Sequence, residues 1–341
     1  MINIAVCGAT GYTGYEIIKI LLRHPKAHIK VLTAKLDKPT KISEEFPELK
    51  GKIDLACEEL VVNHVLKKKV DLVFLALPHR VSMEYASRFI DKGKIVIDLS
   101  ADFRIKDVKV YEKYYGQKHI YKDYITRCVY GLPELYKNRI QRTRFVANPG
   151  CYPTGSILAV APLIAKKIAA KDTIILDAKS GATGAGRKAA LGLIFGEVAE
   201  NLMAYKVGVH QHSPEITQEL STLAGKEVDI LFTPHLVPIR RGILTTAYVS
   251  LNKKADLSSL LRLYRSFYKN APFVKIYDEG LLPQIHDIVN TNYCGIGLAL
   301  SLDKKKVIIV SAIDNLLKGA SGQAVQNMNL ACGFPETMGL E

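Results

Sequence analysis

The stretch INIAVCGATGYTGYEIIKILL, residues 2–22, carries the strongest fold signal in the chain. An apolar run of strand length ends at Gly8, and Gly11 and Gly14 follow at intervals of three. Isoleucines and leucines then recur at helical spacing between Tyr15 and Arg23. This order predicts a strand, a tight glycine turn and a helix, which is the opening unit of a dinucleotide-binding domain.

The rest of the first half continues the same alternation of strand and helix. Further strands are expected over residues 29–34, 71–77, 94–99 and 144–147, with a helix over 81–91. Continuous apolar strands separated by helices indicate a parallel sheet that is covered on both faces. Residues 102–142 are rich in tyrosine, lysine and charge without a clear period, so we expect them to form a peripheral segment.

The second half is richer in strands and more polar on one face. Strands are expected over residues 173–178, 229–232, 243–251, 295–302 and 307–313, and helices over 153–167, 257–268 and 321–331. Long strands with few helices between them indicate a mixed or antiparallel sheet.

The predicted fold class is therefore α/β with two domains. An N-terminal Rossmann-type parallel sheet occupies residues 1–148 and is completed by a C-terminal helix within 315–341. A second α/β domain with a mixed or antiparallel sheet occupies residues 149–314. The length of 341 residues agrees with two domains of ordinary size.

Composition excludes several classes of protein. A hydrophobic content of 48% is too high for a disordered chain, and six cysteines without a CxxC pair exclude a disulfide scaffold and a zinc spacing. We expect no metal. The N-terminal residues lack the pattern of a signal peptide and no apolar run approaches 18 residues, so we expect a cytoplasmic protein with no membrane partner.

The net charge of +14 weakly favours an acidic ligand. The lysines are scattered and no nucleic-acid motif accompanies them, so we expect no nucleic-acid partner.

The glycine turn is the candidate cofactor site, because backbone N–H groups at the start of a helix bind a pyrophosphate. The expected contacts are Gly8, Thr10, Gly11, Tyr12, Thr13 and Gly14. At the end of the second strand, an acid would hold the ribose hydroxyls of NAD. The chain instead carries Thr33 and Lys35 there, and a hydroxyl with a cation suits the 2′-phosphate of NADP.

Cys151 is the candidate nucleophile. It follows Asn148-Pro149-Gly150 and is expected at the start of a helix, since Pro153 suits a first helical turn. The positive end of a helix lowers the pKa of a thiol and so favours the reactive thiolate. The other five cysteines lack such a setting and are expected to be structural.

Two further segments contain residues suited to chemistry. Residues 180–187, SGATGAGR, follow a strand and offer N–H donors, hydroxyls and a guanidinium, a combination suited to a phosphate or to the edge of a cofactor. His210 and His212 are two residues apart and would face one side of a strand. They could form half of a metal site, but a thiol nucleophile more often needs a histidine as its acid/base partner. His79, at the end of a parallel strand, is a candidate to line the site.

Taken together, these motifs resemble those of the N-acetyl-gamma-glutamyl-phosphate reductase family of arginine biosynthesis. The resemblance covers nearly the whole chain and rests on residues 8–14, 77–79, 98–104, 130–134, 148–154, 180–187, 210–215 and 314–320. The family is similar in mechanism to aspartate-semialdehyde dehydrogenase and glyceraldehyde-3-phosphate dehydrogenase.

The resemblance implies an NADPH-dependent reduction of N-acetyl-L-glutamyl 5-phosphate to the semialdehyde through a cysteine thioester. It places the catalytic roles on Cys151 and His212. It makes Ser180, Gly181 and Asn315 candidate cofactor contacts, and Arg104, Arg187, His210 and Glu215 candidate substrate contacts. It also implies a homodimer or homotetramer formed through the second domain.

This sequence departs from the family pattern at two places. Many members carry Ser-Ser-Arg where this chain has Thr33-Ala34-Lys35, and Gln211 stands where an arginine is common. The alternative within the same class is a branch that reduces an acyl phosphate carried on a small acidic carrier protein, which the charge of +14 would suit.

Two other functions would use only part of these features. A cysteine hydrolase would leave the N-terminal glycine turn without a role. A non-catalytic NADPH sensor would leave Cys151 without one.

Overall fold

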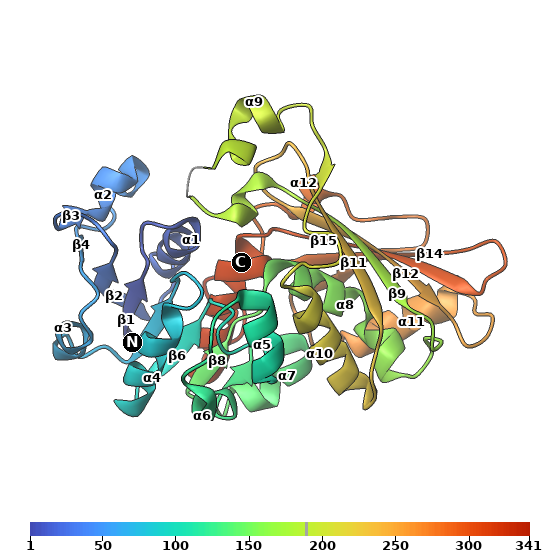
Figure 1. Cartoon of the computed structure of the whole chain (residues 1–341), viewed down its shortest axis with the longest axis horizontal. Coiled ribbons are helices and arrows are strands. Elements are labelled where there is room, and N and C mark those ends of the chain that lie inside the picture. Colours follow the sequence, from blue (N-terminus) through green and yellow to red (C-terminus); the bar gives the residue numbers. More distant parts are fainter. Residues whose placement is uncertain (188–189) are drawn as a thin grey trace. The chain divides into compact units, whose positions relative to one another are not determined.

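The computed structural model describes residues 1–187 and 190–341, and the chain divides into two units (Figure 1). The first unit comprises Met1–Pro149 and Ala320–Glu341, and the second comprises Gly150–Gly319. The chain therefore crosses back into the first unit after Gly319 and not after residue 314. Both units contain a sheet covered by helices, which confirms the predicted α/β class.

The first unit is built on an eight-stranded sheet in the order β3-β4-β2-β1-β5-β6-β8-β7. Its strands are β1 (Ile2–Cys7), β2 (Ala27–Thr33), β3 (Thr40–Lys41), β4 (Ala56–Glu58), β5 (Leu72–Leu75), β6 (Ile95–Asp98), β7 (Val129–Tyr130) and β8 (Phe145–Ala147). All neighbouring strands are parallel except β3 and β4. The parallel-dominant Rossmann-type sheet predicted from the apolar runs is thus confirmed.

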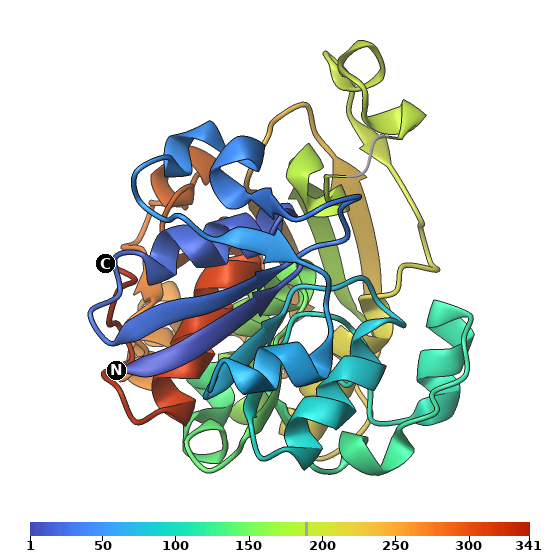
Figure 2. The ribbon, with the colours of Figure 1, turned by 90° about the vertical axis from the view of Figure 1, so that its left-hand side faces the viewer.

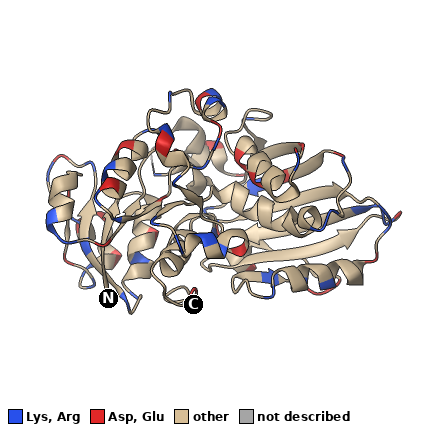
Figure 3. Ribbon diagram, turned by 90° about the horizontal axis from the view of Figure 1, so that it is seen from below, with Lys and Arg blue, Asp and Glu red and all other residues tan. Residues whose placement is uncertain are grey.

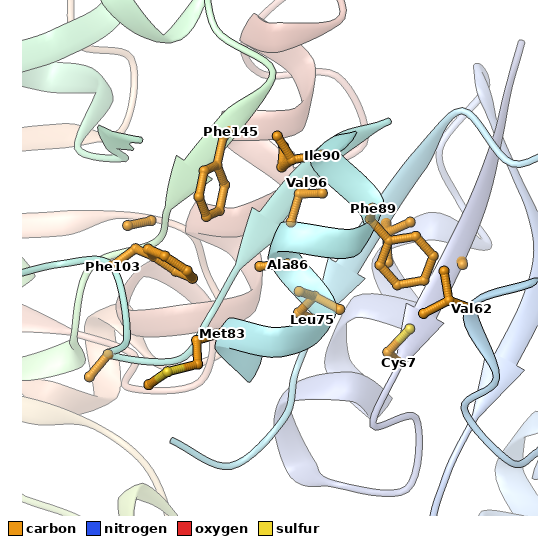
Figure 4. Close-up of a cluster of buried hydrophobic side chains, with 14 of the residues drawn as sticks. Cys7, Val62, Leu75, Met83, Ala86, Phe89, Ile90, Val96, Phe103 and Phe145 are labelled. Carbon is orange, nitrogen blue, oxygen red and sulfur yellow. The ribbon is translucent and has the colours of Figure 1, made fainter. Parts of the chain in front are cut away.

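Helices cover both faces of this sheet (Figure 2). They include α1 (Tyr12–Leu21), α3 (Val62–Lys67), α4 (Ser82–Asp91) and the C-terminal α13 (Gly322–Ala331), with the short α2 (Ile42–Glu45) and a 3-10 turn (Pro47–Leu49) beyond β3. Figure 4 shows Ala86 of α4 facing Leu75 of the sheet, with Phe89 beside Cys7 and Val62 and Met83 on the side of Phe103. Neighbouring residues of β1, such as Ile4 and Ala5, are both fully buried. Because successive side chains of a strand face opposite sides, both faces of the sheet are covered there.

The expectation that residues 102–142 are peripheral is wrong. This segment contains α5 (Val108–Tyr115), α6 (Lys122–Ile125), β7 and α7 (Pro133–Ile140), and β7 extends the sheet beside β8. Tyr111 is fully buried in the core, and Asp107 caps α5 by accepting from the N–H groups of Lys109 and Val110. Each of these helices has eight residues or fewer, too few for a helical period to stand out from charged neighbours.

The second unit is built on a seven-stranded sheet in the order β10-β11-β9-β12-β15-β14-β13. The strands are β9 (Ile174–Ser180), β10 (Met203–Ala204), β11 (Ile230–Leu236), β12 (Ile243–Ser250), β13 (Val274–Ile276), β14 (Cys294–Leu300) and β15 (Lys306–Ile313). β11 pairs with β9 and β13 with β14 in parallel, while the other pairs are antiparallel. The sheet is therefore mixed, as predicted.

One face of this mixed sheet is covered by the helices α8 (Cys151–Ala165), α10 (Ser213–Ala224) and α11 (Leu257–Phe267). From α11, the Tyr264 hydroxyl donates to the Ala159 carbonyl of α8 at 2.7 Å, and the hydroxyl of Tyr268, just beyond the helix, donates to the Leu158 carbonyl at 2.6 Å. The remaining short elements are α9 (Phe195–Val198), α12 (Ile285–Ile288), the 3-10 turns Ala182–Ala185 and Leu191–Leu193, and a π-helical turn at Leu317–Ser321.

The expectation of few helices in this half did not include α10, and the histidine pair was therefore expected on a strand. His212 caps α10 and His210 precedes it, so the pair lies at a helix start and not on a strand. The signal was present, because Pro214 and Glu215 stand in the first turn and Gly225 ends the helix in the left-handed conformation.

Charges of both signs are distributed over the two units. Lys and Arg positions alternate with Asp and Glu along the helices and loops visible in Figure 3. Within the described ranges, no helix combines the length and the apolar character needed to cross a membrane.

Candidate active site

The glycine turn of the first unit connects β1 to α1 and is held by the end of β2. The N–H groups of Gly8 and Ala9 both donate to the Thr33 carbonyl, at 2.8 and 2.9 Å. Gly8 has a φ of +89°, and a Cβ there would collide with the Ala76 carbonyl. A Cβ at Gly14 would likewise collide with the Gly8 carbonyl, so both positions require glycine.

This turn fits a dinucleotide phosphate. Gly11 caps α1 and has no side chain to accept from the N–H groups of Tyr12 and Thr13 in the first turn of the helix. Those donors and the positive helix end suit an anion. Lys35 follows β2 and is exposed, whereas the Thr33 side chain is 1% exposed and lies against Cys7. Thr33 therefore supports the turn through its carbonyl, and Lys35 is the cation at this strand end.

The turn after β5 contains His79 and is fixed from β6. The Ala101 N–H donates to His79 Nδ1 at 2.9 Å, and the Asp102 carboxylate accepts from the N–H of Arg80 at 2.8 Å. Arg80 has a φ of +75°, which Asp102 holds in place. Burial, and secondarily the Asp102 charge, raises the pKa of Asp98 to about 6. His79 thus lies at the carboxyl end of the parallel strands, where ligands bind in such sheets.

Arg104 is nearly buried, with 5% of its surface exposed. Its Nε donates to the Asn148 carbonyl and a terminal nitrogen donates to the Leu99 carbonyl, both at 2.7 Å. These bonds fix the guanidinium against the turn that leads toward Cys151.

Cys151 is the first residue of α8, and Gly150 caps the helix. The predicted start near Pro153 was therefore two residues late. Gly319 lies against the cysteine, because a Cβ at Gly319 would stand 2.8 Å from the Cys151 Cβ. The thiol thus occupies the positive end of a 15-residue helix, a setting that stabilises a thiolate.

The start of α10 packs against the start of α8. The Glu215 carboxylate, fully buried in the first turn of α10, accepts from the Gly150 N–H at 2.8 Å. His212 caps the same helix, and its ring centroid lies 5.9 Å from that of Tyr152, the residue after the cysteine. The structure therefore brings Cys151, His212 and Glu215 together at two adjoining helix starts. The contact of Glu215 with the cysteine turn could not be derived from the sequence.

His210 lies behind His212 in an aromatic cluster. It is 4% exposed, and its ring contacts Tyr152, Tyr205, Phe232 and His212. Burial, followed by the nearby Lys206 charge, lowers the pKa of His210 to about 4. Its Nδ1 accepts from the His212 N–H at 3.1 Å, so the neutral ring orients the backbone of His212.

The hydroxyls of Tyr152 and Tyr205 lie 3.0 Å apart beside this cluster. Neither tyrosine stands out in the sequence as a site residue, because their contact joins the first turn of α8 to a loop more than fifty residues later. Burial raises the pKa of Tyr205 to about 12, so this hydroxyl keeps its proton at neutral pH.

The second glycine segment follows β9 and is held by residues 239–242. The N–H of Gly181 donates to the Gly242 carbonyl at 2.9 Å, and Thr183 donates to the Arg240 carbonyl. The Ser180 side chain is 3% exposed, whereas Arg187 is exposed.

Asn315 links this segment to β12. Its amide donates to the Thr183 hydroxyl at 3.0 Å, and its oxygen accepts from the Gly242 N–H at 2.7 Å. Arg241 pairs with the buried Asp314 at 3.1 Å, an ion pair that sequence reasoning missed. These contacts brace the segment that ends at Gly319 beside Cys151.

The other cysteines have different settings, and none of the six is part of a disulfide in the described chain. Burial raises the pKa of Cys7 to about 12 and those of Cys57 and Cys332 to about 11. Burial also raises the pKa of Cys128. These thiols stay protonated at neutral pH. Over residues 1–187 and 190–341, no group of three His, Cys, Asp or Glu side chains is arranged to hold a metal.

Comparisons with known proteins agree with both units. Residues 3–143 match the family described as the semialdehyde dehydrogenase NAD binding domain, and residues 151–315 match the semialdehyde dehydrogenase dimerisation domain. Among solved structures, aspartate semialdehyde dehydrogenase II of Vibrio cholerae, complexed with ASA, has a TM-score of 0.74 at 16% identity, covering 98% of each chain. A probable aspartate-semialdehyde dehydrogenase of Pseudomonas aeruginosa has a TM-score of 0.73 at 20% identity, covering 97% of this chain and 98% of that one. These likenesses establish the fold.

Curated relatives are far more similar. An N-acetyl-gamma-glutamyl-phosphate reductase of Pelotomaculum thermopropionicum is 47% identical over 99% of this chain and 97% of its own length. A reductase of the same name from Desulfotalea psychrophila is also 47% identical, over 100% of this chain and 98% of its own. Because identity at this level extends over both units, the chain belongs to the N-acetyl-gamma-glutamyl-phosphate reductase family.

Proposed function

We propose that the protein reduces N-acetyl-L-glutamyl 5-phosphate with NADPH to the 5-semialdehyde, NADP and inorganic phosphate, as a step of arginine biosynthesis. The observation that carries the proposal is the placement of Cys151 at the first position of α8, with His212 and Glu215 at the adjoining start of α10. A hydrolase would share these residues but would leave the nucleotide-binding turn of the first unit without a use.

The Cys151 thiolate attacks the acyl carbonyl, the carbon–oxygen bond to phosphate breaks, and a thioester forms. When bound, NADPH supplies a hydride to the thioester carbon. His212 takes the thiol proton. After hydride transfer it protonates the oxygen that has gained charge, and it takes this proton back as the carbon–oxygen double bond re-forms and the carbon–sulfur bond breaks to release the aldehyde and the thiolate. Glu215 holds the cysteine turn through the Gly150 N–H.

The anionic groups of the substrate require cations near the thiol. We propose Arg104 and Arg187 for this role, Arg104 because its guanidinium is preorganised by two backbone carbonyls and Arg187 because it is exposed beyond the glycine segment. His210 supports His212 from behind. The relatives are named for N-acetyl-gamma-glutamyl phosphate, so we propose the free substrate and not one attached to a carrier protein.

The proposal is tested by following nicotinamide absorbance in the reverse direction, with semialdehyde, phosphate and NADP. We expect reduction of NADP that requires both phosphate and the aldehyde. Turnover without phosphate would contradict acyl-phosphate chemistry. The same assay in the forward direction, with free and carrier-bound acyl phosphate in parallel, decides the substrate form.

The residues that would hold NADPH are the glycine turn, with Tyr12 and Thr13 at the start of α1, and Lys35. We expect Lys35→Glu to weaken NADPH binding by roughly 10–150-fold, because a charge-assisted contact to the 2′-phosphate is lost. NADH lacks that phosphate and should bind almost as before. Dissociation constants measured by fluorescence titration decide the matter. An equal loss for both nucleotides would exclude Lys35 as the phosphate contact.

We further propose that the protein assembles as a dimer through the open face of the second sheet. Ile175 of β9 lies between Leu231 of β11 and Tyr248 of β12 in the strand register, and all three side chains are 41–50% exposed. The helices α8, α10 and α11 cover the opposite face. A row of exposed apolar side chains on a sheet is typical of an interface, and the matched family is described as a dimerisation domain.

Ile175→Asp should therefore weaken dimerisation by about 30-fold or more, as expected for a central interface position. Sedimentation equilibrium measures this change. Leu302→Asp is the matched control, because Leu302 is fully exposed in the turn between β14 and β15. Retention of the wild-type mass by Ile175→Asp would place the interface elsewhere.

A further inference from the structure

Residues 190–209, which we call the excursion, belong to the second unit and lie in the sequence between the second glycine segment and the histidine pair. Their 3-10 turn and α9 lead away from the sheet in both views (Figures 1 and 2), and β10 then pairs with β11 at the edge of the sheet. Its apolar side chains are largely exposed, at 48% to 87% of their surface: Leu191, Ile194, Phe195, Leu202, Val207 and Val209. So many exposed apolar side chains on one short segment indicate a surface that another protein covers.

The backbone of the excursion supports the same interpretation. Glu200 and Lys206 have φ values of +57° and +47°, in the left-handed region that non-glycine residues rarely adopt. Such conformations persist where surrounding contacts hold them. Within the described chain, the backbone hydrogen bonds of residues 190–201 are short-range ones inside the excursion, such as those from the Leu193 N–H to the Ala190 carbonyl and from the Val198 N–H to the Ile194 carbonyl.

The two ends of the excursion are parts of the candidate active site. Arg187 and the glycine segment precede it. Near its other end, the Tyr205 hydroxyl lies 3.0 Å from that of Tyr152, and His210 with its bond to the His212 N–H follows directly. The position of the excursion therefore affects both the glycine segment and the histidine that we propose as the acid/base group.

A second copy of the chain is the occupant that the fold favours. β10 of the excursion pairs with β11, the strand that carries Leu231 on the open face of the sheet. The excursion is thus continuous with the face through which we propose that the dimer forms. A twofold interface joins the same patch of both subunits, so an apolar sheet face and an apolar segment beside it can cover each other.

We infer that the excursion of each protomer packs against the partner protomer, and that this contact holds the glycine segment and His212 in their active positions. The inference rests on the proposed dimer and deepens it. An isolated protomer would keep the nucleotide-binding turn of the first unit but would have an incomplete catalytic site.

The test uses Phe195, the most exposed of these side chains at 87%. A photoreactive benzoylphenylalanine placed at residue 195 should give covalent dimers on irradiation, whereas the same group at residue 302 should not. Phe195→Asp should weaken dimerisation by about 30-fold or more. Leu302→Asp is the charge-matched control. Phe195→Leu, which keeps an apolar side chain at this position, should dimerise like the wild type.

Activity and structure are then measured against protein concentration. We expect the specific activity and the rate of Cys151 alkylation of Phe195→Asp to fall with the dimer fraction. A Phe195→Asp variant that dimerises like the wild type, or that is fully active as a monomer, would overturn the inference. The photoreactive variant decides the contact even if the aspartate variant fails to fold.

The outcomes for the two proposals differ. An active wild-type monomer would contradict the dimer itself. If the wild type is a dimer that Ile175→Asp dissociates, but Phe195→Asp still dimerises and the photoreactive residue at position 195 gives no covalent dimer, only the role of the excursion is contradicted.

Discussion

Replacing Cys151 with serine is expected to reduce turnover by roughly 10⁴-fold or more while leaving NADPH binding intact. A serine hydroxyl at the start of α8 is far harder to deprotonate than a thiol, so the covalent intermediate cannot form at a useful rate. The nucleotide-binding turn belongs to the first unit, whereas Cys151 belongs to the second. We therefore expect this variant to keep its affinity for the nucleotide while it loses catalytic activity.

The measurement combines initial rates with nucleotide titration. Cys332→Ser makes the same chemical change at a cysteine of the first unit whose pKa burial raises to about 11, and it should keep activity near that of the wild type. Mass spectrometry after brief treatment with iodoacetamide at pH 7 should find Cys151 modified first, because burial keeps the thiols of Cys7, Cys57 and Cys128 protonated. Activity of Cys151→Ser within tenfold of the wild type would contradict the thioester mechanism.

The sequence predicted those parts of the molecule that depend on local pattern. The turn of residues 8–14 lies between a strand and a helix, and contacts with Ala76 and with the turn itself require glycine at positions 8 and 14, which is part of the physical basis of the pattern. The long strands could be predicted because a strand that is buried on both faces of a sheet has a continuous run of apolar residues. Boundaries were less accurate, as at α8, where the helix begins at Cys151 itself.

What the sequence could not provide are contacts between distant segments. The carboxylate of Glu215 meets the N–H of Gly150 across 65 residues, and Asn315 meets Thr183 across 132. No spacing rule predicts such pairs, since the first depends on how α8 and α10 pack and the second on how the segments after β9 and β15 meet. The same holds for Thr33, whose hydroxyl seemed suited to a phosphate until the structure placed it in the core, 1% exposed.

Such packing gives the two neighbouring histidines different environments, which their spacing in the sequence does not reveal. His210 and His212 have the same side chain and lie two residues apart. One is enclosed by aromatic rings and is neutral above about pH 4, while the other caps the helix beside the cysteine turn. We propose that the second, and not the first, exchanges a proton with the thiol or with a substrate oxygen.

His212→Asn is therefore expected to lower the rate by roughly 10²–10⁴-fold, the usual contribution of a general acid/base. It should also slow alkylation of Cys151 at neutral pH, since the group that accepts the thiol proton is removed. The matched variant is His210→Asn, whose amide oxygen can replace Nδ1 as the acceptor for the His212 N–H. We expect this variant to lose much less activity.

A pH series separates the two roles further. The pKa of His210 is lowered in the folded protein to about 4 from an ordinary value near 6.5, so the unfolded chain takes up this proton first as the pH falls. His210 therefore lowers the stability of the fold progressively as the pH falls from about 6.5 to about 4, with the full loss remaining below pH 4, and this contribution should disappear in His210→Asn. Unfolding free energies by denaturant titration measure it, while the rate profile above pH 7 should keep its shape. If His212→Asn loses less than about fivefold in rate and its alkylation is unchanged, the acid/base role passes to His210, because a general acid/base contributes far more.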